Sequence, residues 1–286
     1  MKIPKHHYVP VFYLKQWALS KGRVSAFQRF HNDKVVATQK PPTHTGYDRG
    51  LYWLQGSDDD EAANTIETLV MGPVDHNAAI AHQYILRDDL KSIPGPIRDA
   101  WSRFLVGLLL RTPENITNAY EKMMNPTERE KGEIREILGA EPALEDLTPI
   151  EMKRVTLRVL VEMIRGTGVE DEISKMKWSI YNLRSSALEF FTSDRPVVMT
   201  RGIGRKGGHL VIPISPKKLF LAFADIDIEQ EIKSRSAADL VGTVNNRIVR
   251  RAIKFAWSTS TKPLDFMQRH LGAEAADDLN FYASLE

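Results

Sequence analysis

Residues 209–223 read HLVIPISPKKLFLAF, and this stretch decides the fold class. Two short apolar runs, at 210–213 and 219–223, are separated by a Ser-Pro pair, which is typical of successive short strands rather than of a helix. Similar runs precede them, bounded by Ser-Ser, Asp-Arg-Pro and glycine-rich segments, at 178–182, 190–192 and 197–200. The sequence therefore predicts a meander of about five strands.

Helical patterns surround this meander. Residues 97–111 are apolar on several faces, which predicts a central buried helix. Thr148-Pro149-Ile150-Glu151 has the cap, proline and glutamate of a helix start. Other patterns predict helices at 237–256 and around 263–271, a short helix at 11–19, a hairpin of strands at 23–30 and 34–38, a strand at 51–54, and helices on both sides of a break at Gly72-Pro73.

We expect a single α+β domain over residues 1–286. A mainly antiparallel sheet, built from the meander and the N-terminal hairpin, should pack against the helical middle of the chain. Residues 114–151 hold ten acidic and four basic residues with few large apolar ones. This composition predicts a peripheral acidic helical excursion from the domain.

Composition excludes several classes of protein. The 286 residues contain no cysteine, which excludes disulfides, thiolate metal sites, iron–sulfur clusters and a cysteine nucleophile. The formal net charge of +2 gives no global argument for binding nucleic acid or a membrane. The longest apolar run is about seven residues, at 104–110, whereas a membrane span needs about 20. We therefore expect a soluble cytoplasmic protein with no membrane partner; its oligomeric state is left open.

The glycine-rich segment at 202–208 resembles a dinucleotide fingerprint by spacing alone. That fingerprint requires a helix after the glycines, whereas the run that follows here is a predicted strand. The segment is better interpreted as a hairpin turn, and no nucleotide cofactor is expected. No spacing of His, Asp or Glu forms a convincing metal motif, so the cofactors are unknown and a divalent metal ion remains an open alternative.

Three polar residues stand at the ends of apolar elements. His7 precedes the first predicted helix, Arg111 ends the most apolar helix, and Asp194 follows a predicted strand at a turn containing Pro196. Imidazole transfers protons near neutral pH, guanidinium binds anions, and a carboxylate orients water or a metal. A basic stretch also accompanies the meander, and its candidate nucleic-acid-binding residues are Arg184, Arg195, Arg201, Arg205 and Lys206.

Four motifs carry a resemblance to a known family. They are His7-Tyr8-Val9-Pro10 followed by Tyr13-Leu14, then Arg111-Thr112-Pro113, Thr192-Ser193-Asp194-Arg195-Pro196-Val197, and Pro213-Ile214-Ser215-Pro216. In this order they resemble microbial domain-of-unknown-function family 4238, over about residues 5–255. The resemblance implies that His7, Arg111 and Asp194 belong to one constellation, but it implies no reaction.

Two interpretations of this constellation remain open. His7, Arg111 and Asp194 are a suitable set for cleaving a phosphodiester, so the chain is a candidate hydrolase, nuclease-like, acting on nucleic acid. Alternatively, the chain is a non-catalytic module that binds nucleic acid or protein, and the three residues form a buried structural network, in which Asp194 could be the partner of Arg111.

Overall fold

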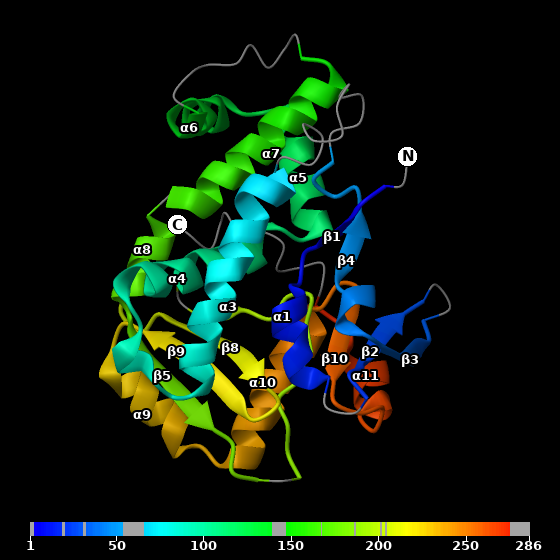
Figure 1. The fold of residues 1–286 in the computed structure, drawn as a ribbon, viewed down its shortest axis with the longest axis vertical. Helices are drawn as coiled ribbons and strands as arrows, with labels where there is room; N and C mark the ends of the chain where they lie inside the picture. Colours follow the sequence, from blue (N-terminus) through cyan, green and yellow to red (C-terminus); the bar gives the residue numbers. More distant parts are fainter. Residues whose placement is uncertain are drawn as a thin grey trace.

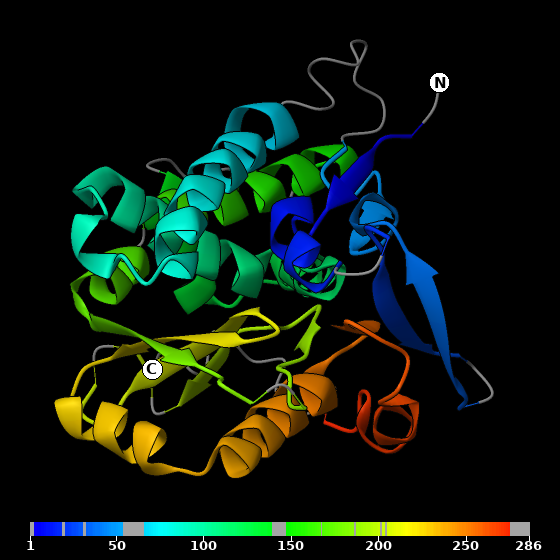
Figure 2. The same cartoon turned by 60° about the horizontal axis from the view of Figure 1, so that its bottom comes forward.

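The computed structural model describes residues 3–18, 21–30, 33–53, 66–138, 147–166, 168–185, 187–200, 202–203 and 205–274. The fold is α+β, as the sequence predicts, and the strands pair in antiparallel fashion. Figure 2 shows three layers, with the cyan and green helices above a yellow-green sheet and the gold and orange helices below it. A second sheet lies beside these layers (Figure 1).

The middle layer is a four-stranded sheet of order β5-β9-β8-β7. Its strands are β5 (Lys177–Asn182), β7 (Val198–Thr200), β8 (His209–Ser215) and β9 (Lys218–Phe223). Alternate residues of a strand face opposite sides of a sheet, and here both sides are apolar. Leu210, Ile212 and Phe220 join the core under the helical middle of the chain. Leu219 and Leu221 join a second core on the other side.

Helices cover both faces of this sheet. The helical middle consists of α3 (Gly72–Leu86), α4 (Gly95–Leu110), α5 (Pro113–Met124), α6 (Glu128–Leu138), α7 (Pro149–Gly166) and α8 (Val169–Lys175). The opposite face carries α9 (Ile226–Ser234) and α10 (Ala237–Arg251). Trp101, Phe104 and Leu105 of α4 are fully buried, which confirms the predicted central helix. The predicted start of α7 is also confirmed, because Thr148 and Glu151 exchange hydrogen bonds.

The second sheet has the order β3-β2-β10-β6. It contains the predicted N-terminal hairpin, β2 (Val24–Arg29) and β3 (Val35–Lys40), together with β6 (Thr192–Ser193) and β10 (Phe255–Ser258), and α11 (Leu264–His270) packs beside it. The N-terminal strand β1 (Lys5–His7) pairs separately with β4 (Tyr47–Arg49). Short 3-10 turns lie at Lys15–Trp17, Pro42–His44 and Leu90–Ser92.

Helix α1 (Val11–Leu14), the start of the predicted helix at 11–19, joins the two sheets. The Tyr13 hydroxyl donates to the Pro213 carbonyl of β8 at 2.6 Å and lies 2.8 Å from the Thr192 hydroxyl of β6. The Trp17 indole N–H donates to the Phe190 carbonyl at 2.8 Å. All three side-chain contacts are buried, so they tie the N-terminal segment to both sheets at once.

Several predicted boundaries were wrong. The run at 190–192 does not join the meander, because Thr192 pairs with Trp257 in the second sheet. The helix predicted at 237–256 ends at Arg251, and Phe255 already belongs to β10. Residues 51 and 52 lie in a turn after β4 rather than in a strand. Gly72-Pro73 does not break the helix, because a π-helical turn, Glu67–Met71, leads directly into α3.

The acidic region at 114–151 is only partly peripheral. Ile116, Ala119 and Met123 of α5 are buried, so this helix belongs to the body of the domain. Helix α6 lies at one end of the molecule beside α7 (Figure 1), with Ile134 as its buried anchor. The excursion therefore begins after α5, and its part at 139–146 lies outside the described residues.

His82 is a core histidine on α3. Its Nε2 donates to the Ile214 carbonyl at 2.9 Å, and its ring stacks on Trp101 with centroids 5.5 Å apart. Burial lowers its pKa to about 4, because the charged imidazolium would lose its hydration in this apolar surrounding. The hydrogen bond to Ile214 opposes this effect without cancelling it.

Protonation of His82 should destabilise the fold in mild acid. The folded-state pKa of about 4 lies below the ordinary value of 6.5, so the stabilisation is complete above pH 6.5 and is lost as pH falls towards 4. We expect a loss of about 2 kcal/mol in the free energy of unfolding between pH 7 and pH 5 from this group. Urea unfolding at both pH values measures it in the wild type and in His82→Phe. An equal pH dependence in both proteins would contradict the assignment.

Candidate functional site

Arg111 is a buried cation at the junction of α4 and α5. Its side chain is 1% exposed, and its Nη1 pairs with the Asp75 carboxylate of α3 at 2.7 Å. Its Nε and Nη2 have no hydrogen-bond partner among the described residues. A guanidinium carries five N–H donors. Nη1 is used by Asp75, so Nε and Nη2 of Arg111 are the donors that an anion could accept from.

The turn that follows the strand pair β1–β4 contacts the backbone of Arg111. The Tyr52 hydroxyl donates to the Arg111 carbonyl at 3.5 Å. The backbone N–H of Tyr52 donates to His6 Nδ1 at 2.9 Å. The His6 and Tyr52 rings also stack, with centroids 5.2 Å apart. His6 is thus an internal support for the turn.

His7 is the neighbour of His6 on β1, and it lies near Arg111. Burial is the main reason that the pKa of His7 is lowered, and the charges of Lys5 and Arg111 lower it further. A hydrogen bond with the Thr43 backbone acts in the opposite direction. Its Nε2 is buried and has no partner in the described part of the chain. His7 is therefore a neutral imidazole at neutral pH, and no described residue hydrogen-bonds to its Nε2.

Glu67 and Asp75 complete this cluster from the π-helical turn and α3. Burial and the nearby Asp75 charge raise the pKa of Glu67 to about 7, although Arg111 opposes the shift. Burial also raises the pKa of Asp75, against the attraction of Arg111. The Asp75 side chain is 22% exposed, so the cluster reaches solvent on the α3 side. A carboxyl group that titrates near pH 7 can serve as a proton donor.

Asp194 has a different environment from His7 and Arg111. Its carboxylate accepts hydrogen bonds from three backbone N–H groups, those of Ile253, Lys254 and Phe255, at 2.6–3.0 Å. Burial nevertheless raises its pKa to about 6, because three neutral donors do not replace full hydration. The ion pair between Asp194 and Arg111 that the structural alternative suggested is not formed, because Arg111 pairs with Asp75.

Tyr8 directly follows β1 and is buried. Its pKa is raised well above the ordinary value by burial, and the negative charges of Asp194, Glu114 and Asp48 add to the effect. Its hydroxyl is buried with no partner among the described residues. Tyr8, the neighbour of His7 in the chain, is therefore close enough to Asp194 for this charge to affect its pKa.

The predicted constellation is therefore two neighbouring groups. The charge of Arg111 lowers the pKa of His7, whereas the charge of Asp194 raises the pKa of Tyr8. Sequence reasoning missed Glu67, Asp75 and Tyr8. The spacing of eight between Glu67 and Asp75 along one helical segment was the available signal, together with the position of Tyr8 inside the N-terminal motif.

The candidate nucleic-acid-binding residues do not gather on one surface. Arg184 is exposed after β5, whereas Arg205 and Lys206 are exposed in the turn between β7 and β8. These positions lie at opposite ends of the sheet, because Asn182 pairs with Lys218 and His209 pairs with Phe223. Arg195 is buried and donates to Asn115 at 3.4 Å. Arg201 lies outside the described residues.

Two further expectations concern the glycine-rich segment and metals. A strand, β8, follows the segment at 202–208 and pairs with β7, so the predicted hairpin is confirmed. Across the described ranges, no group of three His, Asp or Glu side chains is arranged to hold a metal ion. No helix in the described parts is long and apolar enough to cross a membrane.

Comparison with known proteins supports the resemblance seen in the motifs. No curated protein and no solved structure matches the chain. A family described as "Protein of unknown function (DUF4238)" matches residues 5–262. This match covers most of the chain and includes His7, Arg111, Asp194 and the full set of residues around them. The chain belongs to the DUF4238 family.

Proposed function

We propose that His7, Glu67, Asp75 and Arg111 form the active site of a phosphodiester hydrolase. One observation carries this proposal: among the described residues, the buried Arg111 guanidinium has N–H donors without partners, and it lies near the neutral His7 imidazole, whose Nε2 also has no partner. Buried polar atoms without partners are rare in folded proteins, since each costs about 1–3 kcal/mol. A bound phosphate would satisfy the Arg111 donors, because guanidinium matches phosphate oxygens in geometry and charge.

Each residue of this cluster would have its own role in the proposed hydrolysis. Arg111 would hold the non-bridging oxygens of the phosphodiester and neutralise the charge that develops on them. His7 Nε2 would take a proton from the water that attacks phosphorus. Glu67, protonated up to about pH 7, would give its proton to the leaving oxygen as the P–O bond breaks. Asp75 would hold Arg111 in place through their 2.7 Å ion pair.

Asp194 is then a positioning residue rather than a catalytic one. Its two oxygens already accept three backbone N–H groups, which fixes the turn between α10 and β10. This observation supports the alternative in which that part of the motif set holds the fold together. RNA and DNA are the first substrates to test, and the absence of cysteine fits a cytoplasmic protein.

The activity prediction compares two histidines. We expect wild type to cleave labelled RNA or DNA, assayed with and without Mg²⁺, and His7→Gln to be slower by a factor on the order of 10²–10⁴. His76→Gln is the matched control, because His76 is exposed on α3 next to Asp75. Both variants should keep the wild-type melting temperature. Equal rates for His7→Gln and the control, or no cleavage by folded wild type of either substrate, would reject the proposal.

The proposed proton donor gives a pH prediction. Glu67 must be protonated to act, and its pKa is about 7, so the rate should fall as pH rises above 7. The rate should also fall at acid pH, because a protonated His7 cannot take a proton from the attacking water. Glu67→Gln should lower the rate and abolish the alkaline limb in a pH–rate profile from pH 5 to 9. An unchanged alkaline limb in this variant would show that another group is the acid.

Asp194→Asn separates positioning from catalysis. The amide keeps the shape but places an NH₂ group against backbone donors, so we expect a loss of about 1–3 kcal/mol in stability. The melting temperature should fall by several degrees, with the remaining folded protein still active. Asp227→Asn, on the exposed start of α9, is the control. An unchanged melting temperature with a rate loss on the order of 10²-fold or more would instead make Asp194 catalytic.

A further inference from the structure

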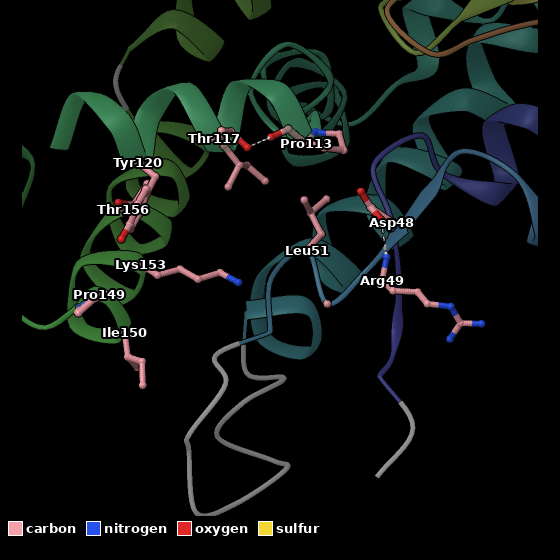
Figure 3. Close-up of a pocket in the computed structure, with 12 residues that line it drawn as sticks. Asp48, Arg49, Leu51, Pro113, Thr117, Tyr120, Pro149, Ile150, Lys153 and Thr156 are labelled. Carbon is pink, nitrogen blue, oxygen red and sulfur yellow. Dashed lines mark hydrogen bonds between the residues drawn. The ribbon is translucent and has the colours of Figure 1, made fainter. Parts of the chain in front are cut away.

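A cavity separate from the polar cluster lies between β4, α5 and α7. Its volume is about 450 Å³, within the range of about 300–1,000 Å³ that is usual for small-molecule sites. Figure 3 shows its walls, which come from the end of β4 and the following turn, from the start of α5 and from the start of α7. None of His7, Glu67, Asp75 or Arg111 lines it.

Most of the wall surface is apolar. Leu51 projects from the turn after β4, and Ile116 and Tyr120 line the α5 side, with Pro113 and Pro149 at the two helix starts. Such walls favour an apolar or ring-containing body, which gains about 25 cal/mol for each Å² of apolar surface that it removes from water. The two prolines and the helices also make the walls rigid.

One cation extends into this apolar space. Lys153 of α7 points across the cavity towards Leu51 in Figure 3. Its Nζ donates a hydrogen bond to the Trp53 carbonyl at 2.9 Å, and among the described residues no carboxylate forms an ion pair with it. Burial lowers the pKa of Lys153, which shows that the ammonium is partly deprived of water. Within the described part of the chain, this ammonium has no counter-charge in ion-pair contact.

The other charged residues of the cavity do not neutralise Lys153. Arg49 points away from the cavity and donates to the Ile3 carbonyl at 3.1 Å. The Asp48 carboxylate accepts the Arg49 backbone N–H at 2.8 Å on the opposite wall. A bound molecule would therefore meet a positive charge at one end and a negative charge at the other, so its acidic group is directed to the Lys153 end.

We propose that this cavity binds a small organic anion, with its acidic group on Lys153 and an apolar ring-sized body between α5 and the turn after β4. The occupant is a phosphate monoester or a carboxylate, since both supply the oxygens that an ammonium binds. The site does not depend on the reaction proposed for His7 and Arg111.

Calorimetric titration of the full chain tests the site with three probes that share one ring: phenyl phosphate, benzoate and neutral benzyl alcohol. We expect saturable binding of at least one anion and much weaker binding of the alcohol. Preference between phenyl phosphate and benzoate identifies the acidic group of the natural occupant. Equal binding of the neutral probe, or no saturable binding of either anion at millimolar concentration, would overturn the proposal.

Four variants locate the binding. Lys153→Met should weaken anion binding about 10–100-fold, the usual value for a charge-assisted hydrogen bond, whereas Lys153→Arg should retain most of it. Thr117→Trp should block the cavity from an exposed position of α5. Lys175→Met is the matched control, because that lysine is exposed on α8 and pairs with Glu172. Wild-type affinity in both Lys153→Met and Thr117→Trp would place the probe elsewhere and reject the site.

Discussion

The need to cover both faces of β8 and β9 governs the architecture. Leu210 and Ile212 face one core, and Leu219 and Leu221 face the other, so neither side of this sheet can be left to solvent. The helical middle covers the first side, and α9 and α10 cover the second (Figure 2). After α10 the chain must turn back into the second sheet. The carboxylate of Asp194 satisfies the backbone N–H groups exposed by that turn.

The polar cluster is a consequence of where α4 ends. This helix is buried along most of its length, so its last turn delivers Arg111 into the interior rather than to the surface. A buried guanidinium needs a counter-charge, and Asp75 supplies it. The same burial places Glu67 close to Asp75, and two carboxyl groups in one dry space cannot both ionise freely. The raised pKa values of Glu67 and Asp75 therefore arise from the packing of these helices.

Local patterns in the sequence predicted most elements, but not their long-range pairing. The cap at Thr148, the central helix and the N-terminal hairpin depend on neighbouring residues, so they could be recognised. The run at 190–192 joins the second sheet through Trp257, a partner far along the chain that no local pattern specifies. Phe255 to Trp257 are apolar at positions that also suit a helix, which explains why α10 was extended too far. His7 and Arg111 could be predicted from motifs. Glu67 and Asp75 could not, because their proximity to Arg111 depends on the packing of α3 against α4. The role of Asp194 could not be predicted, because its carboxylate accepts from three backbone N–H groups. Backbone N–H groups leave no signal in the sequence.

The Arg111-Thr112-Pro113 motif lies between the polar cluster and the cavity that contains Lys153. Arg111 turns inward to the polar cluster, while Pro113 lines the cavity of Lys153. Thr112 stands between them and accepts the Asn115 backbone N–H at 3.3 Å, which sets the start of α5. Because the three residues are consecutive, the end of α4 that carries Arg111 leads directly into the start of α5, which carries Pro113. The polar cluster and the cavity are therefore adjacent along the chain, although different residues form them.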